Sequence, residues 1–198
     1  LDMSKIESGK MTLAEEVIEL PEVMDTIVSI MQSSVKARQQ HFDVRLRYFW
    51  LVQLCCDSLR LRQVLIYVLS YASKFTPPGG TVSFDIEETA SENAAKAWFK
   101  FTVRDTGIGI KPEFLRDIFK PFTREKDSRI DKTEGSGLGM AISKKIVDLM
   151  GGTIDVSSEF GTGTEFTIRL PLPISELELG NFKFPDLKII VVDDDVIV

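Results

Sequence analysis

Hydrophobic and polar positions follow two different periods along the chain. In some short segments apolar residues recur at about every second position, as in a β-strand with one buried face. The predicted strands are Thr12–Ile18, His41–Leu46, Leu51–Cys56, Thr81–Glu88, Trp98–Val103, Thr153–Ser158 and Thr164–Leu170. In other segments apolar residues recur every three or four positions, as on the buried side of an amphipathic helix. The predicted helices begin at Leu20, at the capping pair Asp57-Ser58 and at Ala141, and the last two end near Ser73 and Met150.

Two glycine-rich turns stand between these elements. Asp105–Ile110 follows a predicted strand, and Gly135–Met140 opens a predicted helix. Glycine has no Cβ and tolerates positive φ, so backbone N–H groups at such turns can approach an anion. The polar stretch 124–134 has no apolar period and is expected to form a lid. One such turn is common in proteins that bind nothing there, but the pair favours a site for a phosphate-bearing ligand.

The helix that Asp57 caps has two different faces. One stripe is apolar and predicts the core side, with the members Leu61, Leu65, Val68, Leu69 and Ala72. The opposite stripe, at spacings of three and four, is polar and aromatic, with the members Arg60, Gln63, Tyr67, Ser70, Tyr71 and Lys74. This second stripe is either a solvated surface or a face turned towards a ligand, and helical spacing does not decide between them.

Composition indicates an ordinary globular protein and argues against several functions. Of the 198 residues, 43% are hydrophobic and 27% are charged. The net charge of −6, without a long basic patch, argues against non-specific binding of nucleic acid. The single histidine, His41, and the adjacent pair Cys55 and Cys56 argue against a zinc site and a disulfide framework. No apolar run reaches the roughly 18 residues of a membrane-spanning helix. The sequence starts within a helical segment and without a signal peptide, so we expect a piece of a longer protein.

The C-terminal stretch predicts the start of a further domain. Residues 173–186 contain prolines and acidic residues and are expected to form a linker. Leu187–Val192 is a continuous apolar run, as in a strand that is buried on both faces. Asp193 and Asp194 follow it, and carboxylates clustered at the end of such a strand are typical of a site for a hard cation.

These motifs together resemble the catalytic, ATP-binding domain of sensor histidine kinases of the hybrid type, which carry a receiver domain behind it. DSLRLRQVLIYVLSYASKFT (57–76) resembles the asparagine-containing box of that family, and FKPF (119–122) its phenylalanine box. The two glycine turns resemble its two glycine boxes. LDMSKIESGKM looks like the end of the dimerisation helix pair, and LKIIVVDDD is similar to the opening of a receiver. The resemblance divides the chain into the end of a dimerisation and phosphoacceptor helix (1–10), a catalytic domain (11–172), a linker (173–186) and the first strand of a receiver (187–198).

The resemblance implies a fold, a ligand and a reaction. The expected fold is α/β, a two-layer sandwich in which helices cover one face of a mixed sheet and ATP binds between the helices and the lid. Asp105 is expected to accept a hydrogen bond from the adenine amino group, Lys74 to meet phosphate oxygens, and Arg124 to reach the terminal phosphate. The γ-phosphoryl group is expected to pass to a histidine outside this chain. The nucleotide-binding residues implied are Tyr67, Tyr71, Lys74, Asp105, Gly107, Gly109, Ile110, Phe122, Arg124, Gly135, Ser136, Gly137, Leu138, Gly139 and Thr164.

The sequence departs from the family at the metal-binding position. In the family, the nucleotide-facing stripe of the helix that corresponds to the Asp57-capped one carries asparagines, one of which holds Mg²⁺. Here those positions are Tyr67 and Tyr71. Mg²⁺ takes small, hard oxygen ligands at about 2.0–2.1 Å in an octahedral array. A phenol is bulky, and because its ordinary pKa is about 10 it is neutral at pH 7. The Tyr71 position is therefore a degenerate metal site, and this loss weakens the charge stabilisation on which phosphoryl transfer depends.

Two interpretations of the function stay open. In the first, the domain is a working kinase module whose Mg²⁺ is held by phosphates, water and another residue. In the second, it is a degenerate module that binds nucleotide weakly or without metal and serves as a regulatory or docking element. A third, ATP hydrolysis as in gyrase, needs a carboxylate on the helix to activate water. None occurs between Asp57 and Asp85, so the sequence excludes it.

The resemblance also implies partners and a location. The expected partners are ATP, the dimerisation and phosphoacceptor domain of the same protein, a receiver domain or response regulator, and a second copy in a homodimer. Nucleic acid is not expected. The chain is expected to belong to the cytoplasmic part of a membrane-bound sensor.

Overall fold

A five-stranded sheet is the centre of the computed structural model, which describes residues 10–47, 53–89, 96–123 and 136–175. The strand order is β2-β4-β5-β7-β6. The strands are β2 His41–Arg47, β4 Thr81–Thr89, β5 Lys96–Asp105, β6 Thr153–Glu159 and β7 Gly163–Pro173. Strand β2 runs parallel to β4, and the other neighbouring strands are antiparallel. The sheet is therefore mixed, as the resemblance implied.

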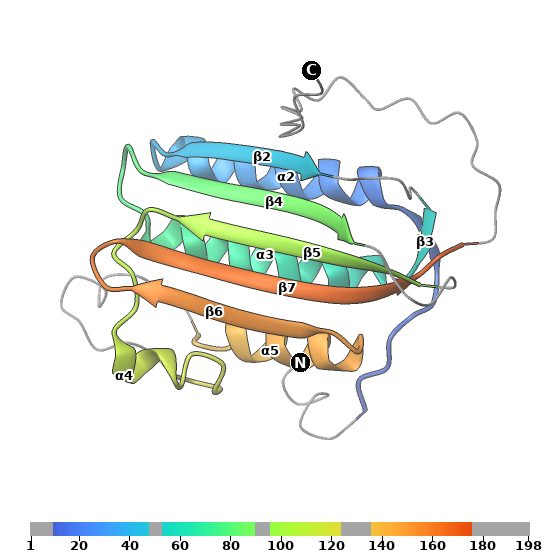
Figure 1. Cartoon of the computed structure of the whole chain (residues 1–198). Coiled ribbons are helices and arrows are strands. Elements are labelled where there is room, and N and C mark those ends of the chain that lie inside the picture. The colour runs from blue at the N-terminus through green and yellow to red at the C-terminus, as the bar shows by residue number, and fades with distance from the viewer. Residues whose placement is uncertain (1–9, 48–52, 90–95, 124–135, 176–198) are drawn as a thin grey trace, which may run out of the picture.

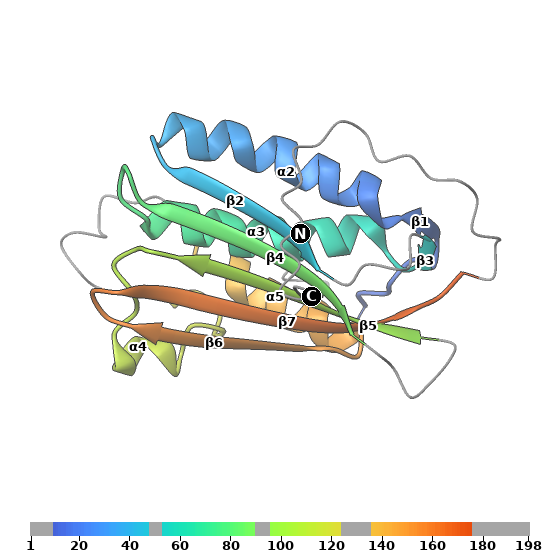
Figure 2. The ribbon, with the colours of Figure 1, turned by 45° about the horizontal axis from the view of Figure 1, so that its top comes forward.

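Helices cover one face of this sheet, as Figures 1 and 2 show. They are α2 Leu20–Ala37, α3 Ser58–Phe75 and α5 Gly139–Leu149, and a short helix, α4 Pro112–Leu115, lies near the β6 edge. The apolar stripe predicted for α3 is fully buried. It belongs to one core with the ring side chains of the inner sheet face, namely Phe84, Phe99, Phe101 and Phe166. The predicted two-layer α/β sandwich is confirmed.

A two-stranded ribbon lies at one end of the sandwich. It pairs β1 Val17–Glu19 with β3 Gln53–Cys55 in antiparallel register. The chain returns to the same ribbon near the end of the described residues, because Leu54 forms a bridge with Ile174. The backbone N–H of Ser175 also donates to the carbonyl oxygen of Gln53. The segments that lead into and out of the domain therefore meet at one corner.

The strand predicted at residues 12–18 is wrong over most of its length, because this segment bonds to the start of α3 instead. The backbone N–H of Ala14 donates to Oδ2 of Asp57 at 2.9 Å, and Oε1 of Glu16 accepts from the backbone N–H of Ser58 at 2.9 Å. The Ser58 hydroxyl also donates to Glu16, and these two hydrogen bonds lower the pKa of that carboxyl. Only β1, at the end of the segment, forms strand pairs.

Helix α3 and strand β7 are among the elements that extend beyond their predicted bounds. Helix α3 continues to Phe75, two residues past the predicted end at Ser73. Strand β7 continues to Pro173, where the predicted linker begins. Its pairing with β6 stops at Arg169 while its pairing with β5 continues through Pro171 and Pro173, so these prolines lie where β7 has one open edge, a usual place for proline in a sheet.

The uncovered face of the sheet carries a row of ion pairs. Asp85 on β4 lies between two arginines, with its Oδ2 2.7 Å from Nη1 of Arg104 and its Oδ1 3.9 Å from Nη1 of Arg45. Arg104 also pairs with Glu165 on β7. This row of alternating charge crosses β2, β4, β5 and β7. The Asp85 side chain is only 11% exposed, whereas those of Arg45 and Arg104 are 37% and 49% exposed, so the arginines shield this carboxylate from solvent.

Further findings concern the length of the helices, the two cysteines and the predictions that cannot be placed in the fold. Within the described ranges no helix is long and apolar enough to cross a membrane. Cys55 and Cys56 are free thiols, and burial raises the pKa of the Cys56 thiol to about 12, so it stays protonated. Residues 1–9 of the helix end predicted at 1–10, the lid at 124–134 with Gly135, and the receiver strand with Asp193 and Asp194 lie outside the described residues.

The burial of the α3 stripe yields a stability prediction with an internal control. Leu65 is 0% exposed and Leu59, on the same helix, is 64% exposed. We expect Leu65→Ala to lower the free energy of unfolding by about 2–5 kcal/mol, because it removes buried methyl groups and leaves a cavity. Leu59→Ala should change it by less than about 0.5 kcal/mol. Urea unfolding of both variants measures this, and equal effects would contradict the assigned orientation of α3.

Candidate functional site

The candidate site is built at the end of β5, where the first glycine turn begins. Asp105 is the last residue of that strand and is only 8% exposed. Its Oδ1 accepts a hydrogen bond from the backbone N–H of Gly107 at 2.8 Å, and it lies opposite Thr164 in the register of β5 and β7. Burial raises the pKa of Asp105 to about 6, although the N–H groups of Gly107 and Thr164 offset part of the rise. The result is a buried carboxylate, held rigidly, that accepts hydrogen bonds.

The glycines of this turn are required by close backbone contacts. A Cβ on Gly107 would overlap the carbonyl oxygen of Phe75 at the end of α3, and one on Gly109 would overlap that of Glu159 at the end of β6. Gly109 also has a φ of +67°, a conformation that favours glycine. The backbone N–H of Ile108 donates to the Phe75 oxygen at 3.2 Å. The turn therefore fits tightly between α3 and the β6–β7 hairpin.

Sequence reasoning missed Ser158, which fixes the far side of the same turn. Its Oγ accepts from the backbone N–H of Ile110 and donates to the carbonyl oxygen of Gly163, both at 2.8 Å. It also lies 2.9 Å from Oγ1 of Thr164. The only local signal for this role is the glycine-rich sequence of the hairpin that follows, which does not single out one serine.

The second glycine turn precedes α5 and is bonded to the phenylalanine box. The backbone N–H of Phe122 donates to the carbonyl oxygen of Gly137 at 3.1 Å, and Gly137 has a φ of +69°. The Phe122 ring itself is 69% exposed. The backbone N–H of Leu138 donates to Oγ of Ser136 at 3.4 Å. The first N–H groups of α5 have no partner within their own helix, as at every helix start, so this end suits an anion.

The two tyrosines lie on α3 between these turns. The ring of Tyr67 faces the start of α5, since a Cβ added to Gly139 would lie 3.6 Å from its Cγ. Tyr67 Oη accepts a hydrogen bond from Nε2 of Gln63 at 3.3 Å. The ring of Tyr71 packs against Phe75, with the centroids 4.5 Å apart, and edge-on against Phe166 at 5.5 Å. Tyr67 and Tyr71 of the predicted stripe are thus half-buried, whereas Ser70 is exposed and donates to Sδ of Met31 on α2 at 3.9 Å.

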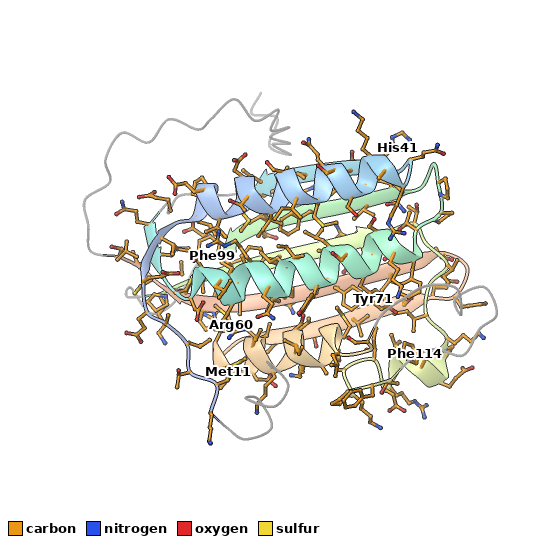
Figure 3. All side chains as sticks on the ribbon, turned by 180° about the vertical axis from the view of Figure 1, so that it is seen from behind. Met11, His41, Arg60, Tyr71, Phe99 and Phe114 are labelled. Carbon is orange, nitrogen blue, oxygen red and sulfur yellow. The ribbon has the colours of Figure 1, made fainter. Side chains whose placement is uncertain are left out.

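Lys74 places a positive charge on the last turn of α3. Its Nζ lies 5.2 Å from the centroid of the Phe75 ring. Figure 3 shows Tyr71 towards the end of the molecule where His41 and Phe114 also lie. The structure therefore brings Asp105, Thr164, the glycine turns, Lys74 and the tyrosines to neighbouring elements at one end of the sheet. Arg124 and Gly135, predicted for the same site, lie outside the described residues.

The residues present do not fit Mg²⁺. The Tyr71 ring is held by two other rings, and a neutral phenol in that setting cannot replace a small, hard oxygen ligand. In the part of the chain that the structure describes, no three His, Cys, Asp or Glu side chains gather where they could hold a metal ion. The arrangement supplies a buried acceptor at one end, backbone donors at the other, and no described ligand for a cation between them.

Comparisons with known proteins agree with this fold. The family model described as "Histidine kinase-, DNA gyrase B-, and HSP90-like ATPase" matches residues 56–174. Sensor protein GacS of Pseudomonas syringae pv. syringae is 36% identical over 173 residues, which are 87% of this chain and 19% of that protein. Hybrid signal transduction histidine kinase B of Dictyostelium discoideum is 32% identical over 88% of this chain and 9% of its own length. The chain thus spans a fifth or less of these relatives.

A solved structure gives the same result at the level of the fold. Full-length ShkA, determined in complex with AMPPNP, superposes with a TM-score of 0.71. The match covers 88% of this chain and 34% of that chain at 24% sequence identity. The sandwich and its helix arrangement are therefore shared with a known protein structure, whereas the residues of the site must be judged from this chain.

The buried state of Asp105 predicts a pH dependence of stability. Its pKa of about 6 in the folded chain lies above the ordinary value of 3.8, so the carboxyl stabilises the fold below pH 4 and this contribution is lost as the pH rises through 6. Asp105→Asn removes the ionisation. The free energy of unfolding of the wild type, relative to that of the variant, should therefore fall by up to about 3 kcal/mol between pH 4 and 7. Urea titrations across this range measure it, and a difference independent of pH would contradict the burial of this charge.

Proposed function

Since the chain belongs to the family of histidine kinase-, DNA gyrase B- and HSP90-like ATPases, we propose that it is the catalytic ATP-binding module of a hybrid sensor histidine kinase. The module binds ATP and presents the γ-phosphoryl group to a histidine outside this chain. The observation that carries the proposal is the buried Asp105 carboxylate, fixed beside a glycine turn that packs on the end of α3. Relatives named as sensor and hybrid histidine kinases support it.

In this proposal the two turns bind opposite ends of the nucleotide. Asp105, when ionised, accepts a hydrogen bond from the adenine amino group, and Gly107 leaves room beside the base. The N-terminus of α5, after Gly137 and Leu138, donates N–H groups to phosphate oxygens. Lys74 contributes a positive charge from the last turn of α3. Arg124, Gly135 and Ser136 are proposed to complete the phosphate end, and Ile110, Phe122 and Thr164 to border the pocket.

Phosphoryl transfer in such a module depends on positioning and on electrostatic stabilisation more than on covalent chemistry of the protein. The residues of this chain orient the nucleotide, and the phosphoacceptor histidine comes from the dimerisation domain of the same protein. A receiver domain or a response regulator is the proposed final acceptor, and Asp193 and Asp194 are proposed to belong to such a receiver. A homodimer and a location on the cytoplasmic side of a membrane-bound sensor complete the proposal.

A second function is favoured by one specific observation, the packing of Tyr71 between Phe75 and Phe166. This ring stands where the family holds Mg²⁺, so the module binds the nucleotide with its adenine and phosphate contacts but with no protein ligand for the metal. The domain then acts as a degenerate, nucleotide-responsive regulatory element. The two functions share the adenine site and differ in turnover, so metal dependence separates them.

Calorimetric titration with ATP, once with excess Mg²⁺ and once with EDTA, tests both. We expect ATP to bind with a Kd that Mg²⁺ changes by less than about threefold, because Tyr71 supplies no metal ligand. Tyr71→Asn should make binding at least about tenfold tighter with Mg²⁺ than with EDTA. Tyr71→Phe is the matched control, since it keeps the ring and should stay indifferent to Mg²⁺. Tight binding by the wild type only with Mg²⁺ would contradict the degenerate function and support the working kinase.

The proposed contact between Asp105 and adenine is tested with a variant of Asp105, and inorganic triphosphate serves as the control ligand. Asp105→Asn should weaken ATP binding by at least about tenfold, because an amide cannot accept from the adenine amino group and from both backbone N–H groups at once. Binding of inorganic triphosphate, which has no base, should stay within about twofold of the wild type. Equal losses for both ligands would place Asp105 away from the adenine and contradict the proposed orientation.

Turnover is tested in the full protein, which contains the phosphoacceptor histidine. The kinase function predicts transfer of label from the γ-phosphate to that histidine in the wild type. The degenerate function predicts label only after Tyr67→Asn and Tyr71→Asn are combined. Failure of the chain to bind ATP at all, with or without Mg²⁺, would contradict both.

A further inference from the structure

The last turn of α3 lacks the backbone donors that usually end a helix. The carbonyl oxygens of a last turn have no partner within the helix and are commonly bonded by the N–H groups of the residues just after it. Thr76 is the C-terminal cap of α3, and the next two residues are Pro77 and Pro78, which have no N–H. The Thr76 hydroxyl donates to the carbonyl oxygen of Ala72 at 2.7 Å, whereas the donors to the carbonyl oxygens of Ser73 and Phe75 come from other parts of the chain.

Gln40 supplies two of these donors from the turn between α2 and β2. Its Nε2 donates to the carbonyl oxygen of Ser73 at 2.8 Å and to that of Thr76. Its Oε1 accepts from the Ser73 hydroxyl at 2.8 Å. Gln40 is only 9% exposed, and a buried amide with both Nε2 hydrogens and its oxygen bonded is held in one orientation.

The backbone around Gln40 is fixed as well. The backbone N–H of Gln40 donates to the carbonyl oxygen of Val35 at 3.1 Å, and this hydrogen bond closes the C-terminal end of α2. Gln39 has a φ of +56°, the left-handed conformation common at this position after a helix, and its carbonyl oxygen accepts from the N–H of Gly79. The amide of Gln40 therefore approaches α3 from a rigid turn on a neighbouring element.

The turn of α3 that Gln40 holds also contacts the candidate site directly. Phe75 offers its carbonyl oxygen to the N–H of Ile108, and Gly107 lies so close to this oxygen that a Cβ there would overlap it. Tyr71 and Lys74 stand on the same end of the helix. In Figure 3, His41, the next residue after Gln40, lies at the end of the molecule towards which Tyr71 lies.

We propose that Gln40 is a positioning residue of the nucleotide site. It fixes the last turn of α3 so that the Phe75 oxygen holds the first glycine turn, and with it Asp105, in the geometry that binds adenine nucleotide. Gln40 itself touches no ligand. This inference rests on the proposed function, because the ligand positioned is the nucleotide, but its structural half is measurable without one.

The test compares Gln40→Met with Gln39→Met, an identical substitution at the exposed neighbouring glutamine. Methionine keeps the length and flexibility of the stem and removes the donors and the acceptor. Gln40→Met should weaken ATP binding by about tenfold and speed hydrogen exchange of the Ile108 amide by at least about tenfold. The Ile168 amide, in the core strand β7, should report only global stability. Gln39→Met should leave Kd and Ile108 exchange within about twofold of the wild type.

A milder variant covers the case in which Gln40→Met does not fold. Ser73→Ala removes the hydroxyl that orients Gln40 and should weaken ATP binding by about threefold with faster exchange at Ile108. If either folded variant loses stability but keeps the wild-type Kd and the wild-type Ile108 protection, Gln40 is a structural cap only and the proposal is overturned. If the wild type binds no ATP, the proposed function fails, and the Ile108 exchange of the variants decides the role of Gln40 by itself.

Discussion

The carbonyl oxygen of Phe75, at the end of α3, is the point at which the core and the candidate site meet. The helix reaches it because its apolar stripe is buried against the sheet, and the glycine turn reaches it because Gly107 has no Cβ. Pro77 has no N–H to offer the end of the helix, and the Phe75 oxygen accepts instead from Ile108, which is distant in sequence. A small shift of this turn therefore moves the buried carboxylate of Asp105 relative to the helix that carries Tyr71 and Lys74.

The two halves of the site have different physical characters. At the Asp105 end, burial raises the pKa of the carboxyl to about 6, so the fold accepts a cost in stability at neutral pH to keep an ionised acceptor. In the middle, the rings of Tyr71, Phe75 and Phe166 form an apolar cluster that extends the core. Apolar packing and a charged acceptor on neighbouring elements are compatible with a flat, amine-bearing base, as proposed above. They do not suit a hydrated dication.

Local patterns predicted much of this structure and missed what depends on long-range contacts. The apolar stripe of α3 and the glycine turn at Asp105 depend on neighbouring residues and were predicted from local patterns, whereas the sandwich was implied by the resemblance to the family. The strand expected at 12–18 fails because Glu16 bonds to Ser58, which is distant in sequence. Gln40 gave no signal, since a glutamine in a polar turn resembles any exposed residue until α3 lies beside it. The role of Ser158 gave no signal either, because its hydrogen bond with Ile110 joins residues that are distant in sequence.

The corner at which β1, β3 and the end of β7 meet is also the place where the longest helix beside the candidate site begins. Ala14, Leu54 and Ile174 all lie in or beside this corner, and α3 starts there at Ser58. Tyr71 is thirteen residues further along the helix, which at 1.5 Å per residue is about 20 Å away. Any displacement of this corner therefore acts on the start of α3, and the far end of the same helix carries the candidate site.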